Sequence, residues 1–214
     1  DIHSNFEALE AVLADMKRVQ EVWCLGDIVG YGPNPNECCE IVRKRAKYCV
    51  AGNHDWAVVG KINLSWFNPL ALEAIKINRK ILSEENKDFL KSLPEKKKID
   101  DILLVHGSPR KPMSEYLFRD RQAQLAFQAF SEKVCFVGHT HWPLVFKDGQ
   151  RRIINPGSVG QPRDGDPRTS YLVFDDEKLT FEFRRVEYKI EKTQLKMKKL
   201  ALPEPLIQRL AFGR

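Results

Sequence analysis

The chain has 214 residues, of which 43% are hydrophobic, and it carries a formal net charge of +6. This length and apolar content suit one compact domain with a packed core, and they exclude a disordered chain. No apolar run approaches the roughly 18–20 residues of a membrane helix, no signal peptide is visible, and the five cysteines show no CxxC spacing. We therefore expect a reduced, cytoplasmic protein without a disulfide framework.

Helix-like and strand-like segments alternate over the first 150 residues. Apolar residues at helical spacing from Phe6 to Met16 predict a first helix, with Asn5 as its N-cap. Further helices are predicted over residues 36–46 and 120–130. Short apolar runs predict buried strands over residues 22–25, 48–51, 102–105 and 134–137. This order predicts an α/β fold.

Residues 56–95 break the alternation. Asn68 and Ser83 have the character of helix N-caps, so this segment predicts a helical lid insertion beside the site. Trp56 and Trp66 lie within it. We interpret both as core of the lid, with stacking on a nucleobase as the alternative.

The C-terminal third changes character. Its short strands are separated by turn signals and predict antiparallel hairpins over residues 144–146, 152–154, 171–174 and 179–184. Residues 189–214 predict a basic helical tail, and we expect residues 1–214 to form a single domain.

The positive charge is concentrated in Lys96–Lys98 and in the predicted tail. Such runs are typical of solvated faces, and we prefer this interpretation to nucleic-acid binding. The charge also suits a small anionic substrate. The oligomeric state stays open.

The buried strands share one feature, because each ends at a glycine-containing loop with side chains that can ligate metal. These loops are Gly26-Asp27, Gly52-Asn53-His54-Asp55, His106-Gly107 and Gly138-His139-Thr140-His141. Asp1-Ile2-His3 has the same character, and the five loops contain all five histidines. Since sites in open α/β sheets form outside the carboxyl ends of strands, we expect these residues at one sheet edge.

The mixture of nitrogen and oxygen donors suits Mn, Fe, Zn, Ni or Co rather than Mg or Ca, and Mn is the favoured ion. A pair of divalent ions needs a bridging carboxylate, and Asp27 is the natural candidate. Four of the loops follow a predicted strand, whereas Asp1-Ile2-His3 follows none. We therefore expect a further strand of about 5–6 residues upstream of Asp1.

Taken in order, the loops resemble the pattern of the calcineurin-like metallophosphoesterases: D-x-H, G-D, G-N-H-[DE], a lone His with Gly, and G-H-x-H, from Asp1 to His141. Residues 154–163 are also similar to small bacterial and archaeal members, some of which are phosphodiesterases or dinucleoside polyphosphate hydrolases. The resemblance implies an αββα four-layer sandwich of mixed β-sheets with a dimetal site at the sheet edge.

The same resemblance assigns roles to residues. It implies one metal held by Asp1, His3, Asp27 and His141, and a second held by Asp27, Asn53, His106 and His139. His54 would then be a transition-state stabiliser or general acid close to the leaving oxygen. From the residues alone, ligand, structural and catalytic roles are all open for His54.

The favoured hypothesis is a dinuclear-metal-dependent phosphoesterase. A metal-bridging hydroxide would attack phosphodiester or phosphoanhydride bonds of a small phosphate ester, with dinucleoside polyphosphates among the candidate substrates. Arg110 and Arg163 are candidate phosphate contacts or surface loop residues, and Tyr31 lines the pocket or belongs to a plain loop. No membrane partner is expected.

The alternatives are a phosphomonoesterase or protein phosphatase of the same family, a non-catalytic scaffold with this fold, and a nuclease or nucleic-acid-binding module. An eroded scaffold should show replaced ligands, and none is replaced here. The basic tail motivates the nucleic-acid alternative, which steep salt dependence of oligonucleotide binding would support.

Overall fold

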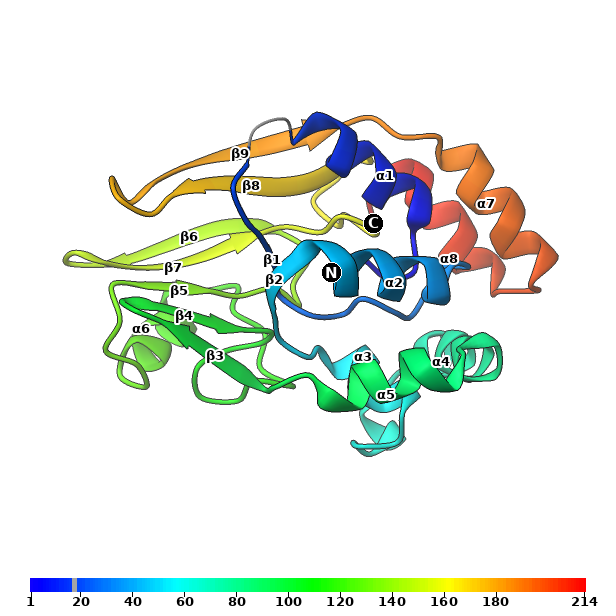
Figure 1. Ribbon diagram of the computed structural model, residues 1–214, viewed down its shortest axis with the longest axis horizontal. Coiled ribbons are helices and arrows are strands. Elements are labelled where there is room, and N and C mark those ends of the chain that lie inside the picture. Colours follow the sequence, from blue (N-terminus) through cyan, green and yellow to red (C-terminus); the bar gives the residue numbers. More distant parts are fainter. Residues whose placement is uncertain (17–18) are drawn as a thin grey trace.

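The computed structural model describes residues 1–16 and 19–214, and among these a five-stranded mixed sheet lies in the left half of Figure 1. Its strands run in the order β3 (Lys96–Ile99), β4 (Ile102–Val105), β5 (Val134–Phe136), β7 (Arg151–Pro156) and β6 (Pro143–Asp148). The three inner strands are parallel, and the edge strands β3 and β6 are antiparallel to their neighbours. The carboxyl ends of β4 and β5 therefore meet at one edge.

Two smaller sheets accompany the large one. β1 (Val22–Cys24) pairs in parallel with β2 (Ala46–Cys49), and β8 (Thr169–Asp175) pairs antiparallel with β9 (Thr180–Val186). Both predicted C-terminal hairpins, β6–β7 and β8–β9, are thus confirmed. In Figure 1 the long hairpins extend to one side of the molecule, and most helices lie on the other.

Alternating side chains of the large sheet enter two separate cores, as the period of two in a strand requires. Leu103 and Val105 of β4 pack with Ala126 and Phe127 of α6 (Asp120–Phe127). Ile102 and Leu104 of the same strand face the other way, toward side chains of the small sheets: Trp23, Tyr48, Leu172, Phe174 and Phe181. The large sheet is therefore covered by a helix on one face and by the small sheets on the other.

The fourth layer is helical. α1 (Phe6–Asp15) and α2 (Pro35–Arg45) pack through Leu9 and Val42 in one cluster with Cys24 of β1. The order helix, sheet, sheet, helix confirms the expected αββα architecture. Asn5 caps α1 as predicted, because its side chain accepts a hydrogen bond from the Ala8 N–H at 3.2 Å.

The segment over residues 56–95 is helical, as predicted. It contains η1 (Leu64–Trp66), α4 (Pro69–Ile81) and α5 (Glu84–Ser92), and it follows the short helix α3 (Asn53–Val58). Asn68 and Ser83 cap α4 and α5. Trp56 packs on the core cluster, whereas Trp66 is 59% exposed, so the core interpretation is wrong for Trp66. The role of a lid stays a prediction.

The basic tail forms α7 (Ile190–Lys199), α8 (Glu204–Arg209) and η2 (Leu210–Phe212). Met197, Leu206 and Ile207 pack against α4 and Tyr31, which brings the end of the chain next to the loop after β1. No helix in the described residues is both long and apolar enough to cross a membrane. The five cysteines are free thiols, as expected.

One strand escaped prediction. The lysines of Lys96–Lys98 form β3, where Lys96 and Lys98 are exposed, so the run is both a solvated face and an edge strand. Lysine has weak strand propensity, and pairing with β4 imposes the extended conformation. Charge on an edge strand also opposes pairing with another molecule.

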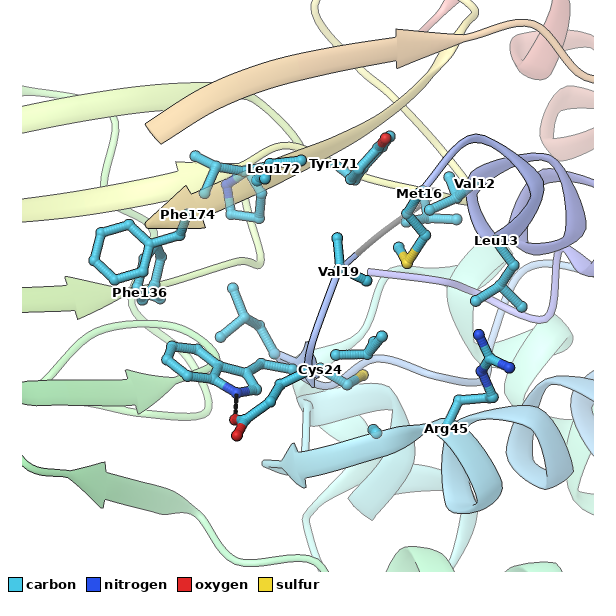
Figure 2. Close-up of a pocket in the computed structure, with 18 of the residues that line it drawn as sticks. Val12, Leu13, Met16, Val19, Cys24, Arg45, Phe136, Tyr171, Leu172 and Phe174 are labelled. Atoms are coloured by element: carbon cyan, nitrogen blue, oxygen red, sulfur yellow. Dashed lines mark hydrogen bonds between the residues drawn. The ribbon is translucent and has the colours of Figure 1, made fainter. Parts of the chain in front are cut away.

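A cavity of about 590 Å³ separates β1 from β8 (Figure 2). Apolar side chains including Val12, Leu172 and Phe174 line it, and β1 and β8 each pair with only one other strand among the described residues. Asp1 adjoins the cavity, and its main-chain nitrogen donates to the Gly26 carbonyl at 3.0 Å. The strand expected upstream of Asp1 stays a prediction.

Candidate metal centre

The predicted ligands meet at one edge of the sheets, and all but Asp1 and His3 lie in a loop that follows a strand. Asp27 follows β1, Asn53 and His54 open α3 after β2, His106 follows β4, and the last two histidines follow β5. All eight side chains are buried, with exposed fractions between 0 and 8%: Asp1, His3, Asp27, Asn53, His54, His106, His139 and His141. The fold thus gathers residues from Asp1 to His141 in one buried cluster.

The loops approach one another so closely that two positions accept only glycine. A Cβ atom on Gly52 would lie 2.0 Å from Oδ1 of Asp27, and one on Gly138 would lie 2.7 Å from Oδ2 of Asp1. Asp27 and His139 themselves adopt left-handed backbone, with φ of 50° and 66°. Such strain in residues other than glycine is typical of functional sites.

One half of the cluster contains two imidazoles with facing lone pairs. Nδ1 of His3 lies 3.1 Å from the Val29 carbonyl, and Nδ1 of His141 lies 2.6 Å from the Gln161 carbonyl. Since a carbonyl only accepts hydrogen bonds, each Nδ1 carries the proton and each Nε2 carries a lone pair. The two Nε2 atoms are 2.9 Å apart, and Oδ1 of Asp1 lies 3.3 Å from Nε2 of His141.

Burial lowers the pKa of His3 and of His141 well below the usual histidine value. A shared proton therefore does not account for the facing lone pairs, which would repel each other without a cation between them. The donor set of two neutral imidazoles and a carboxylate fits a divalent transition metal.

The other half of the cluster also contains an imidazole whose Nε2 keeps a lone pair. Nδ1 of His106 donates to the Leu25 carbonyl at 2.8 Å, which leaves its Nε2 as a lone-pair donor. This atom lies 3.0 Å from Oδ1 of Asn53, 3.2 Å from Nδ1 of His139 and 3.4 Å from Oδ2 of Asp27. Two imidazoles, an amide oxygen and a carboxylate thus converge on one point.

Asp27 joins the two halves. Its Oδ2 lies 3.6 Å from Nε2 of His3 and 3.4 Å from Nε2 of His106, so one carboxylate oxygen faces both groups. Its Oδ1 accepts the backbone N–H of His54 at 2.8 Å, which fixes the orientation of the carboxylate. This is the arrangement that a bridging ligand requires.

Residues 1–178 match the family model of the calcineurin-like phosphoesterase superfamily domain. The chain belongs to this family. It is 47% identical to a metallophosphoesterase from Sphaerobacter thermophilus of known structure, with a TM-score of 0.93 and coverage of 100% of this chain and 96% of that one. The family and the fold predicted from the loops are thus confirmed, and the chain is a metal-dependent phosphoesterase.

Two further relatives extend the comparison. An uncharacterized protein of Methanocaldococcus jannaschii is 42% identical over 236 residues, covering 100% of this chain and 96% of its own length. A hypothetical protein from Pyrococcus horikoshii shares the fold with 23% identity and a TM-score of 0.87, over 100% of this chain and 96% of that one.

His54 of this phosphoesterase lies between the candidate metal ligands and the aromatic rings of Tyr31 and Phe67. Its ring centroid is 5.0 Å from that of His3, 4.5 Å from that of Tyr31 and 5.0 Å from that of Phe67. Its Nδ1 has no hydrogen-bond partner among the described residues. A ring nitrogen also groups with His3 and Asp27 within ligand distance, so the geometry admits both a catalytic role and a metal ligand role.

Asp55 is a positioning residue to which the sequence analysis assigned no role. Its Oδ1 accepts the N–H groups of Ile28 and Val29 at 2.9 and 3.1 Å, and its Oδ2 accepts that of Gly52 at 2.9 Å. These bonds tie the loop of Asp27 to the start of α3. The signal that points to Asp55 is its place directly after His54 in the loop motif.

The candidate substrate contacts divide into two groups. Tyr31 is buried with its ring centroid 4.8 Å from that of His3, and the guanidinium of Arg163 lies 5.5 Å from the centre of the Tyr31 ring. The Arg110 guanidinium pairs instead with Glu115 at 3.3 Å, and the Arg110 backbone N–H donates to Oγ of Ser108 within the same loop. The structure brings Tyr31 and Arg163 to the cluster but shows no such contact for Arg110, and all three roles stay predictions.

Two residues near the centre escaped sequence analysis. The ring of Tyr116 stacks on that of His139, with centroids 3.8 Å apart and planes 20° apart. Arg209 donates to Oε1 of Gln161 at 3.3 Å, the oxygen that Arg163 also contacts at 2.8 Å. Tyr116 lies in an irregular loop and Arg209 in the tail, and neither position carries a motif that points to the centre.

The buried imidazoles predict acid destabilisation of the metal-free phosphoesterase. Burial lowers the pKa of His54 to about 4, whereas the unfolded chain titrates near 6.5. Between these values only the unfolded state binds the proton, so stability is complete above about pH 6.5 and falls as the pH falls toward 4. For His54 alone the loss is about 3 kcal/mol. Urea unfolding in EDTA between pH 7.5 and 4 measures it, and a flat profile would contradict the burial argument.

Proposed function

We propose that this phosphoesterase holds two divalent transition-metal ions, preferably Mn, and hydrolyses phosphodiester or phosphoanhydride bonds of small substrates, nucleotides among them. One ion is held by Asp1, His3, Asp27 and His141, and the other by Asp27, Asn53, His106 and His139. One observation carries the proposal: Oδ2 of Asp27 lies 3.6 Å from Nε2 of His3 and 3.4 Å from Nε2 of His106.

Two ions bound there would lower the pKa of a water molecule and neutralise charge developing on the phosphate oxygens. The protein contributes orientation. The Nδ1–H groups of His3 and His141 donate to backbone carbonyls, which holds each Nε2 toward the ions. Such contacts remove the need for the ligands to reorganise when substrate binds.

His54 acts as a hydrogen-bond donor in this proposal. It is neutral at pH 7 because burial lowers its pKa to about 4, so one ring nitrogen keeps an N–H that can donate a hydrogen bond to the charge developing on a leaving oxygen. Arg163 acts beside it as a phosphate contact. Arg163 donates to Oε1 of Gln161 at 2.8 Å and pairs with no carboxylate within the described residues, so its charge is available for an anion.

Charge balance favours a substrate with one negative charge on the reacting phosphate. Two divalent ions bring four positive charges and the carboxylates of Asp1 and Asp27 remove two, while Asn53 is a neutral ligand. Ionisation of one water leaves a single positive charge. A phosphodiester carries one negative charge, whereas a phosphomonoester carries up to two, so the diester matches this site better.

A substrate panel tests this proposal. With Mn supplied, we expect bis-p-nitrophenyl phosphate or a dinucleoside tetraphosphate to be hydrolysed with a kcat/KM at least about tenfold above that of p-nitrophenyl phosphate and of a phosphopeptide, and EDTA to abolish turnover. Preference for the monoester or the phosphopeptide would establish the phosphatase alternative instead. Turnover confined to oligonucleotides, with steep salt dependence, would establish the nuclease alternative.

A further inference from the structure

Three exposed aromatic side chains form a continuous surface beside the metal centre, here called the aromatic shelf: Tyr116, Phe118 and Trp142. Tyr116 and Phe118 belong to the loop between β4 and α6, and Trp142 directly follows His141. Their exposed fractions are 42, 46 and 43%, although each is a large aromatic residue. Clustered exposed apolar surface of this kind is typical of a binding site.

The shelf starts at a candidate metal ligand and runs outward. The Tyr116 ring stacks on His139 at a centroid distance of 3.8 Å. The Phe118 ring is parallel to that of Tyr116, with 7° between the planes and 5.9 Å between the centroids, and the Trp142 ring meets Phe118 edge-on at 6.1 Å. A ligand on the shelf would therefore be adjacent to the metal centre.

The core of the protein does not account for these side chains. Leu117, between the two loop aromatics, is 1% exposed and packs in the cluster under α6, so it anchors the loop while its neighbours project into solvent. Trp142 is held by its backbone, which donates to Oγ1 of Thr140 at 3.3 Å. Asn155 in turn donates to the same Thr140 oxygen at 2.8 Å, so polar contacts fix the backbone at the Trp142 end of the shelf.

The neighbouring charges indicate what an occupant carries. Arg163 and Arg209 lie 5.5 and 6.0 Å from the centre of the Tyr31 ring and share the Gln161 oxygen, and neither pairs with a carboxylate in the part of the chain described. The site thus combines unpaired guanidinium groups with planar aromatic faces. A phosphate joined to a planar base matches both features. The phosphate suits the guanidinium groups, and a base of any identity can stack on an aromatic side chain.

We propose that the aromatic shelf binds the nucleobase of the substrate by stacking, so that this phosphoesterase selects nucleotide-type phosphate esters. The inference rests on the proposed function for the position of the reacting phosphate. One nucleoside spans from the metal centre to the shelf, with its phosphate at the ions and its base against Phe118 and Trp142.

Calorimetric titration of the Mn-loaded protein with AMP, a product of the proposed reaction, tests the shelf without turnover. We expect Trp142→Ala and Phe118→Ala each to raise the Kd for AMP by roughly 5- to 150-fold, the range for one stacking contact. The Kd for inorganic phosphate, which has no base, should not change. Leu195→Ala, which truncates a side chain 56% exposed on α7, is the matched control and should bind both ligands as the wild type does.

The outcomes separate the shelf from the proposed function. If a chromogenic diester is hydrolysed but both shelf variants bind AMP normally, the shelf proposal is overturned and the phosphodiesterase stands. If no diester is hydrolysed but AMP binding still depends on Trp142, the shelf proposal stands and the phosphodiesterase proposal is overturned. Equal weakening of AMP and phosphate would assign the shelf a structural role, and wild-type protein that binds AMP no better than phosphate would exclude a base subsite.

Discussion

Asp27→Asn is expected to reduce Mn-dependent hydrolysis of bis-p-nitrophenyl phosphate by about 1000-fold or more. The Asp27 oxygen that faces both histidine groups is the proposed bridge between the two ions. An amide in its place offers one neutral oxygen, and its NH2 group would donate to an imidazole lone pair that the metal needs. Initial rates over a range of Mn concentrations measure the loss.

The same substitution should leave the fold intact. Asn tolerates left-handed backbone better than most residues, which suits the φ of 50° at this position, and its carbonyl oxygen can still accept the His54 N–H. Asp88→Asn, the same change on an exposed face of α5, is the matched control and should retain full activity. Equal activity in the two variants would show that the reaction does not depend on the Asp27 carboxylate.

His54→Ala is expected to lower kcat by about 100- to 1000-fold, the range for the loss of one transition-state hydrogen-bond donor, while metal content stays at the wild-type value. Its ring lies beside His3, and its buried Nδ1 has no hydrogen-bond partner in the described residues. A substrate with a good leaving group, such as p-nitrophenolate, should lose less activity than one with an alcohol leaving group.

Metal analysis of the His54→Ala protein distinguishes the two roles that the geometry admits. A ligand role, which the grouping of His54 with His3 and Asp27 permits, predicts that one ion per chain is lost together with activity. A catalytic role predicts loss of activity alone. Loss of the ion would make His54 a ligand of the first ion and would exclude it as the hydrogen-bond donor to the leaving oxygen.

The gathering of the candidate ligands was predictable in part, because these residues occur in short motifs at strand ends. Topology alone places the carboxyl ends of the parallel strands β4 and β5 at one edge, so His106 and His139 meet there, whereas Asp27 reaches them because the β1–β2 sheet packs on the large sheet. Glycine was informative for a physical reason, since Gly52 and Gly138 face carboxylate oxygens at distances that no Cβ tolerates.

The rest depended on tertiary contacts that leave no local pattern. Tyr116 and Phe118 lie in an irregular loop where no periodicity separates an outward aromatic from a buried one, and only the packing of Leu117 decides their direction. Arg209 reaches the centre because the tail folds back onto Tyr31. β3 forms because β4 provides a partner, against the propensity of its lysines.

Anomalous diffraction from crystals grown with Mn is the most direct test of whether Asp27 bridges two ions. We expect two peaks, one beside His3 and His141 and the other beside His106 and His139, with Asp27 bound to both. A single peak, or two peaks of which only one contacts Asp27, would contradict a bridging role for Asp27.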